Sequence, residues 1–373
     1  MTTVLTNWTL GDLGQQGDAH CACQKILDTL TAAGFDTTAA AEIQQMFQAS
    51  ARRLLSNSAT ATETTDARAF WVPGRIEVLG KHTDYAGGKS LLGAVNKGFA
   101  VVSTSRDGQN DVRIFTQFSD GRELNETLRI TGTPEDLERL RTCTTDEGGW
   151  AAYPAAAVQR LTSNFGITVG ADIAIECSLP EASGMSSSSA VICYMWMVLD
   201  SYNNISSGIN GKATNAAAFQ RSIGRVDVPG EGQANLYTFL GNIENGKDFR
   251  PGQGDLTLNG MGGVGTFGGS EDHTVSNGGG WLHTRFYLHT RSFSCTLFLV
   301  CILLRTYPLS LAPFLFLLPS FCVQAIMSCT KNELKMWEYC PTKHLRTVAV
   351  DPDVQFVIAV SGAKAEKTGA AMK

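Results

Sequence analysis

Residues 172–199 read DIAIECSLPEASGMSSSSAVICYMWMVL and place three patterns in direct succession. Residues 172–178 alternate Ile173, Ile175 and Cys177 with smaller or charged side chains, which predicts a β-strand. Residues 190–199 are apolar on every side, which predicts a buried helix rather than a surface one. The serine-rich loop at 180–190 therefore leads into the N-terminus of a helix.

This position favours a bound anion, because free backbone N–H groups and the positive end of the helix dipole face the loop. Serine hydroxyls would add hydrogen bonds or a magnesium ligand. The loop is not a Walker motif, since no G-K-[ST] follows its glycine. A serine-rich helix cap with nothing bound remains the alternative.

The segments on either side predict an α/β or α+β fold. Apolar residues recur at three- and four-residue steps over 24–56, which predicts helices. A Thr/Ala-rich link at 58–65 precedes the first strand-like run, at 69–79. The apolar run VQFVIAV at 354–360 is typical of an interior strand. Strands and helices mixed in this way favour α/β classes.

Composition places the chain among globular proteins and excludes some functions. Its 373 residues, 43% of them hydrophobic and 17% charged, suffice for two domains or one large one. A net charge of −5 argues against a nucleic-acid binder. The ten cysteines include no C-x-x-C pair, which favours scattered free thiols over a zinc site. The first residues lack a signal-peptide pattern, so we expect a cytoplasmic protein.

A second loop, PGRIEVLGKHTDYAGG at 73–88, gathers several polar side chains among glycines at the end of a β-rich run. Its polar residues are Lys81, His82, Asp84 and Tyr85. Glycine lets backbone and ligand approach closely, so the pattern suits a strand end that faces a polar ligand. A surface turn with solvated charges is the alternative reading.

A third loop, GGVGTFGGSEDHT at 262–274, holds Asp272 among glycines. A carboxylate in such a loop could be a general base or a metal ligand, whereas the alternative is a flexible acidic turn. A hydrolase dyad of Asp272 and His273 is disfavoured, because neighbours in a strand point to opposite faces and no G-x-S-x-G motif exists.

Taken together and in this order, the three loops resemble the GHMP kinases, which include galactokinase, homoserine kinase and mevalonate kinase. The loop at 73–88 is similar to the galactokinase signature G-R-[VI]-N-L-I-G-E-H-T-D-Y-x-G-G. The matching residues are Gly74, Arg75, Gly80, His82, Thr83, Asp84, Tyr85, Gly87 and Gly88. The loop at 180–190 resembles the superfamily phosphate loop P-x-x-x-G-[LM]-S-S-S-A, and 262–274 resembles the Gly-Gly-x-[MED]-D loop of galactokinases.

The resemblance implies ATP-dependent phosphorylation of a sugar hydroxyl, at the anomeric carbon, in a cleft between two domains. Asp272 takes the place of the catalytic base, and Arg75 that of the residue stabilising developing charge. Sugar-binding roles fall on Lys81, His82, Asp84, Tyr85 and Gly269. ATP-binding roles fall on Gly184, Met185, Ser186, Ser187, Ser188 and Ser189. The hydroxyls of Ser187 and Ser188 would help to place Mg²⁺, in keeping with a reaction that depends on positioning and charge neutralisation.

Two departures from the signature put galactose in doubt. Lys81 stands where galactokinases usually carry Glu, and Glu77 stands where Asn is usual. A donor-only ammonium in place of an acceptor-only carboxylate inverts the local hydrogen-bond pattern. A different hexose or an acidic sugar is therefore an alternative substrate. A non-catalytic sugar and ATP sensor is a further alternative, although the presence of both Arg75 and Asp272 favours the enzyme.

Residues 275–324 differ abruptly from the rest of the chain, since they contain no Asp, Glu or Lys. A membrane span at 297–321 is long enough, but Arg305 and three prolines interrupt it. We interpret the segment instead as a translated intron. Val275-Ser276 can be encoded by a splice-donor sequence, pyrimidine-rich codons precede Gln324, and excision joins Thr274 to Ala325 in the family pattern.

The sequence thus predicts four parts in a two-domain α/β (α+β) GHMP kinase fold. These are a helical N-terminal segment at 1–66, the kinase N-terminal domain at 67–274, the foreign insert at 275–324 and a resumption of the kinase fold at 325–373. We expect the N-terminal α/β domain to be nearly complete and the ferredoxin-like C-terminal domain to be mostly missing. We expect the activity of this interrupted chain to be impaired, because apolar insert residues would lie beside Asp272.

Overall fold

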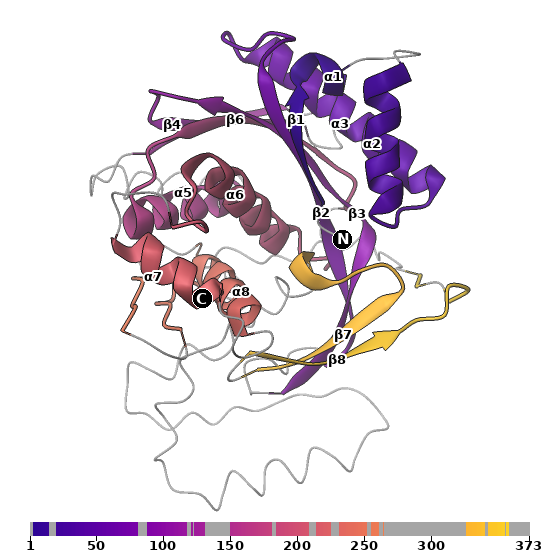
Figure 1. The fold of residues 1–373 in the computed structure, drawn as a ribbon, viewed down its shortest axis with the longest axis vertical. Coiled ribbons are helices and arrows are strands. Elements are labelled where there is room, and N and C mark those ends of the chain that lie inside the picture. Colours follow the sequence, from indigo (N-terminus) through magenta and orange to yellow (C-terminus); the bar gives the residue numbers. More distant parts are fainter. Residues whose placement is uncertain are drawn as a thin grey trace, which may run out of the picture.

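The computed structural model describes most of the chain outside the insert. The described residues are 3–14, 20–80, 88–117, 121, 123–130, 150–180, 184–208, 214–224, 231–251, 255–260, 264, 326–339, 342–354 and 356–357. They form one mixed sheet with helices on both faces (Figure 1). The predicted α/β class is confirmed.

The N-terminal part contains a strand as well as the predicted helices. The first elements are β1 (Thr3–Thr9), α1 (Leu10–Gly14), α2 (His20–Ala32) and α3 (Thr37–Asn57). Asp36 caps α3, since its carboxylate accepts a hydrogen bond from the Ala39 N–H at 2.8 Å. Strand β1 pairs with β2, so the segment 1–66 adds to the same sheet rather than standing apart.

The remaining elements alternate between strands and helices. They are β2 (Asp66–Leu79), β3 (Lys89–Arg106), β4 (Asp111–Gln117), β5 (Glu123–Arg129), α5 (Ala152–Phe165), β6 (Gly170–Cys177), α6 (Ser187–Asn203), α7 (Thr214–Ile223), α8 (Glu231–Asn245), β7 (Glu333–Glu338) and β8 (Lys343–Ala349). Strand order is β1-β2-β3-β6-β4-β5, and β7 joins β3 to β8. Among the pairs in the described chain, β4 and β6 run parallel and the others antiparallel.

Alternate residues of the long strands supply two separate cores. Phe70 and Val72 of β2 belong to the core shared with α5 to α8, whereas Ala69 and Trp71 belong to the core under α1 to α3. This split follows from the period of two in a strand, which sends successive side chains to opposite faces. Helices cover both faces of the sheet, as Figure 1 shows.

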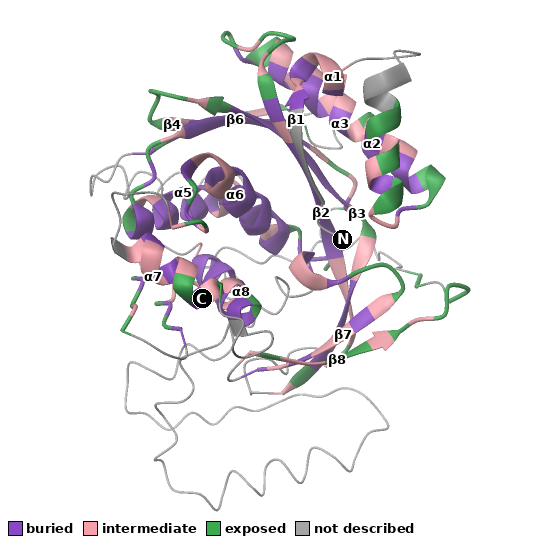
Figure 2. Ribbon diagram, viewed as in Figure 1, coloured by how far each residue is buried: buried purple, intermediate pink, exposed green. Residues whose placement is uncertain are grey.

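Helix α6 is the central helix of the larger core, and its burial confirms the sequence prediction. Every residue from Ser189 to Leu199 is buried, and the helix is purple over most of its length in Figure 2. The aromatic rings of Trp196, Phe219 and Phe239 pack in tilted or edge-on pairs 4.8 to 5.8 Å apart. Burial on all sides explains why this helix carries no polar stripe.

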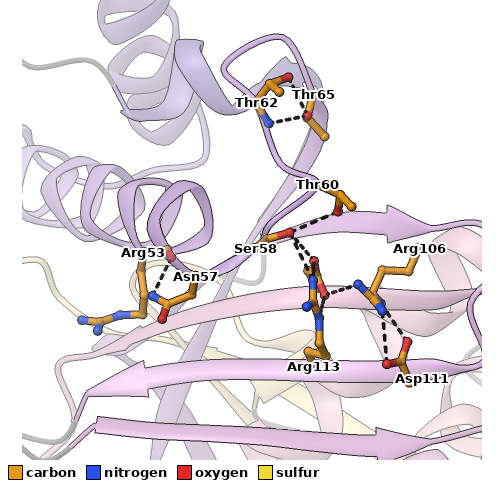
Figure 3. A network of polar contacts seen from close by, with 10 residues as sticks. Arg53, Asn57, Ser58, Thr60, Thr62, Thr65, Arg106, Asp111 and Arg113 are labelled. Carbon is orange, nitrogen blue, oxygen red and sulfur yellow. Dashed lines mark hydrogen bonds and ion pairs between the residues drawn. The ribbon is translucent and has the colours of Figure 1, made fainter.

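Strand β6 carries Asp172, whose buried carboxylate is paired with arginine and serine side chains. Asp172 is 1% exposed and accepts hydrogen bonds from the Nε of Arg113 at 2.7 Å and the Oγ of Ser58 at 2.6 Å. Arg106 lies 3.4 Å from the same carboxylate and also pairs with Asp111 (Figure 3). Ser58 is the C-cap of α3, so this network ties that helix to the sheet.

The expectation of an interior strand at 354–360 is wrong for the residues that the structure describes there. Val354, Phe356 and Val357 lie outside any strand and are 53%, 47% and 90% exposed. An apolar run alone does not identify a strand, because exposure depends on what packs against the run.

Among the described residues, no helix is both long and apolar enough to span a membrane. The stretch 297–321 lies outside them.

Candidate active site

The loop before α6 has the backbone geometry of an anion cradle. Gly184 has a φ of +72°, and a Cβ added there would meet nothing within 4 Å, so the space beside it is open. Ser186 adopts a left-handed conformation, with φ 57° and ψ 47°, and makes no side-chain capping bond to the helix. A left-handed residue between glycine and helix turns successive N–H groups toward one side, as in known anion-binding nests.

The first turn of α6 presents its N–H groups to this loop. The first helical hydrogen bond runs from the Ala190 N–H to the Ser186 carbonyl at 3.1 Å, so the N–H groups before Ala190 precede the helical ladder. Ser187 is exposed and Ser188 is half-buried, which leaves both hydroxyls within reach of a ligand. Open space, N–H groups and hydroxyls together fit a phosphate chain with its magnesium.

Ser189 has a different partner from the other loop serines. Its hydroxyl is buried and donates to Oε2 of Glu244 at 2.8 Å. The Ser189 side chain therefore holds the loop to α8. Because its hydroxyl is engaged in this bond, only the Ser189 backbone is left for the predicted role in ATP binding. Glu244, 6% exposed in the last turn of α8, is a residue that the sequence analysis missed. Its one sequence signal is a lone acid beside the apolar run of that helix.

Magnesium in nucleotide sites prefers a few oxygen ligands together with substrate phosphates. The hydroxyls of Ser187 and Ser188, and the Glu244 carboxylate that contacts the neighbouring Ser189, are oxygen donors of this kind. Within the part of the chain that the structure describes, no cluster of three or more His, Cys, Asp or Glu side chains could hold an ion by itself. The donor set therefore fits an ion shared with phosphates better than a closed protein cage.

Arg75 brings two of the predicted loops together. It lies near the end of β2, and its backbone N–H donates to the Met185 carbonyl at 3.1 Å. Its Nη1 donates to the Gly184 carbonyl at 2.9 Å. The neighbouring Gly74 permits this approach, since a Cβ there would lie 2.6 Å from Leu179 and 3.0 Å from the Met185 carbonyl. The Arg75 guanidinium therefore lies beside Gly184, at the edge of the anion cradle.

The two ends of the loop at 81–87 are fixed at the same end of β2 and β3. Gly80 has a φ of +91°, and its carbonyl accepts a hydrogen bond from the Ser90 hydroxyl at 3.3 Å. Gly88 accepts one from the Tyr339 N–H at 3.2 Å. The predicted sugar-binding residues between them lie outside the described residues, namely Lys81, His82, Asp84 and Tyr85.

The predicted base Asp272 and the sugar-loop residue Gly269 also lie outside the described residues. The approach to their loop is described as far as Val264, whose N–H donates to the Glu244 carbonyl at 3.2 Å. Glu244 therefore contacts the serine-rich loop through its side chain and Val264, ahead of the predicted catalytic residues, through its backbone. After the insert, the chain re-enters the main core at Ile326, which is fully buried.

Comparison with known families gives matches to the segment that contains Arg75 and to the segment that contains the anion cradle. Residues 60–104, which include Arg75, match the galactokinase galactose-binding signature. Residues 152–238, which include the anion cradle, match the GHMP kinases N terminal domain. These two matches fall on the segments that the Arg75–Gly184 hydrogen bond joins.

Curated relatives share the same region. The galactokinase of Lactobacillus helveticus is 33% identical over 146 residues, which cover 38% of this chain and 35% of that enzyme. The galactokinase of Bacillus subtilis is 31% identical over 143 residues, covering 38% of this chain and 33% of the relative. The matched region thus spans about a third of the length of these relatives.

Solved structures with a partly similar arrangement include Lactococcus lactis galactokinase complexed with galactose. That structure covers 81% of this chain and 51% of its own chain, at 16% identity and a TM-score of 0.44. Methanococcus jannaschii mevalonate kinase covers 40% of this chain and 50% of its own, at 19% identity and a TM-score of 0.26.

Proposed function

We propose that this chain, a galactokinase-like member of the GHMP kinase superfamily, is an ATP-dependent sugar kinase that forms a sugar 1-phosphate. The observation that carries the proposal is the hydrogen bond from Arg75 to Gly184. It places a cation from the sugar-binding signature at the rim of a helix N-terminus suited to phosphates, where a phosphoryl group would be transferred.

The residues divide the chemistry as follows. The N–H groups of the loop from Gly184 to Ser188 hold the triphosphate, and Arg75 neutralises charge that develops on the transferred group. The sugar hydroxyl oxygen attacks the γ-phosphorus, the bond to the β-phosphate oxygen breaks, and ADP leaves. Asp272 accepts the hydroxyl proton. The hydroxyls of Ser187 and Ser188 would help to hold a bound Mg²⁺, which would add charge neutralisation on the phosphates.

Binding of the sugar falls to the loop that follows Gly80. His82 and Asp84 hold sugar hydroxyls, with Tyr85 and Gly269 completing the pocket. Lys81 selects for a sugar other than galactose, because an ammonium donates where the usual Glu accepts. An acidic sugar or a different hexose is the substrate class that such a cation favours. Lys81→Glu should shift preference toward galactose, and an unchanged profile over a panel of free sugars would refute this specificity.

The test is ATP turnover over a sugar panel, measured for the chain as given and for a form without residues 275–324. We expect turnover by the shorter form and little by the longer one. Asp272→Asn and Arg75→Lys should each lower kcat by about 10²–10³-fold. Arg221→Lys, on the exposed end of α7, is the control for the arginine exchange. ATP binding with no turnover of any sugar would instead favour a non-catalytic sensor.

A further inference from the structure

A small lobe follows α8 and is closed on itself. We call residues 246–251 and 255–260 the α8 lobe. Phe249 and Leu258, both fully buried, form a bridge with hydrogen bonds of 2.8 and 2.9 Å in the two directions. The Gly260 N–H donates to Oδ1 of Asp248 at 2.7 Å, which fastens the end of the lobe to its beginning. The chain therefore leaves the lobe close to where it entered.

One buried arginine holds both sides of this lobe from within. Arg160 of α5 is 1% exposed, and its Nη2 donates to the Lys247 carbonyl at 2.8 Å and the Leu258 carbonyl at 3.3 Å. One turn later, Asn164 donates to the Asn259 carbonyl at 3.3 Å. Helix α5 thus forms hydrogen bonds with both the first and the last part of the lobe.

The buried guanidinium of Arg160 is only partly paired within the described part of the chain, although it also lies 5.7 Å from the centre of the Phe239 ring. Its Nε and Nη1 atoms are buried and have no hydrogen-bond partner among the described residues. Burial lowers the pKa of Arg160 to about 10, although Asp248 favours the charge. An incompletely paired buried charge costs free energy, and an apolar side chain of similar size is often at least as stable there. What favours an arginine here is its pair of hydrogen bonds to the Lys247 and Leu258 carbonyls, which join the two sides of the lobe.

The lobe is joined to the phosphate loop through the last turn of α8. Asn242 donates to the Asp248 carbonyl at 2.9 Å, and the Lys247 N–H donates to the Asn242 carbonyl at 3.1 Å. Between these contacts lies Glu244, whose carboxylate holds the Ser189 hydroxyl and whose carbonyl holds the Val264 N–H. Fixing the lobe therefore restrains the last turn of α8 and with it the Glu244 carboxylate that holds Ser189.

We propose that Arg160 is a positioning residue for nucleotide binding, acting through the α8 lobe and Glu244 on the phosphate loop. This role rests on the proposed kinase function. The guanidinium fork suits the task, because one planar group with several fixed donors can hold two carbonyls at once. A lysine at this position would reach only one of them with comparable geometry.

The test compares Arg160→Met with the unaltered full chain by amide hydrogen exchange, ATP calorimetry and thermal unfolding. We expect at least about tenfold faster exchange at Phe249, Leu258 and Gly260, and an ATP Kd about tenfold higher, with Tm unchanged or raised. Faster exchange should extend to the Ala190 N–H at the start of α6. Arg160→Lys should recover only part of both changes, and Arg221→Met is the matched control that should leave them unaltered.

A second variant tests the inference even if Arg160→Met does not fold. Asp248→Ala removes the Gly260 contact from the exposed side of the lobe and introduces no buried cavity. It should raise exchange in the lobe and the ATP Kd in the same direction but by less. Unchanged exchange and unchanged ATP Kd in these variants would overturn the inference. Absence of ATP binding both by the unaltered chain and by the form without residues 275–324 would contradict the proposed kinase function. Exchange at the α6 N-terminus would still decide whether Arg160 orders the loop.

Discussion

Gly80 occupies a conformation and a space that no other residue type fits. Its φ is +91°, and a Cβ would lie 2.1 Å from the Lys89 carbonyl oxygen. Gly80→Ala should therefore destabilise the protein by about 1–3 kcal/mol and raise the KM for the sugar, because the loop that follows carries the residues proposed to bind the sugar. Gly108→Ala is the control, since its φ of +75° brings strain but no atom lies within 4 Å. Urea unfolding of both variants checks the difference, and equal losses would contradict the steric argument.

Asp200 near the end of α6 makes stability depend on pH. Burial raises its pKa above 3.8, although hydrogen bonds from the Ser206 N–H and hydroxyl oppose the shift. The folded protein then binds more protons than the unfolded chain in the window above pH 3.8, so the Asp200 contribution to stability falls as pH rises through that window. Asp200→Asn, which cannot ionise, should flatten the dependence and keep or raise stability at pH 7.

The measurement for Asp200 is urea unfolding at a series of pH values. Asp28→Asn, on the exposed side of α2, is the control and should leave the pH profile unchanged. A steeper loss of stability toward neutral pH in Asp200→Asn would contradict the assignment.

Strand β6 and helix α3 are held together by the network around Asp172. Removing a partner from a buried charge network leaves uncompensated charge, so Asp172→Ala should cost about 3–5 kcal/mol. The substitution would remove the carboxylate partner of the Arg113 guanidinium and leave Arg106 paired with Asp111 alone. Glu42→Ala, which breaks the pair with Lys97 at side-chain exposures of 54% and 43%, is the control and should cost at most about 1 kcal/mol. Comparable losses in chemical unfolding would refute the buried-network argument.

Elements with a strong local sequence pattern were predictable from the sequence. The residues that pack against these elements in the fold were not. The apolar run at 190–199 identified α6, and the alternation at 172–178 identified β6. The resemblance of two loops to GHMP kinases is confirmed by the family matches. The sequence analysis did not single out Glu244 or Arg160, because a charged residue in a largely apolar helix does not indicate which loop it will contact in the folded protein. The run at 354–360 misled because its described residues have nothing packed over them.

At the scale of the whole chain, residues 275–324 differ from the rest of the sequence in composition. Their deletion should yield more monodisperse protein with a higher Tm, because it removes a largely apolar stretch that the family pattern does not include. Size-exclusion chromatography and thermal unfolding of the two forms check this. Transcript reads across the junction of Thr274 and Ala325 are the independent control, and uniform coverage of the insert with no spliced product would contradict the intron interpretation.

The pairing of β3 with β7 has a consequence for synthesis on the ribosome. Residues 99–106 of β3 pair with β6, but Lys89 pairs with Glu338. At about 5–20 residues per second, roughly 12–50 s separate the emergence of these two partners. One end of β3 thus offers an unpaired edge to other nascent chains throughout that interval. Residues 275–324 lengthen this interval, so production of this protein in cells should depend more on chaperones than the stability of the folded protein suggests.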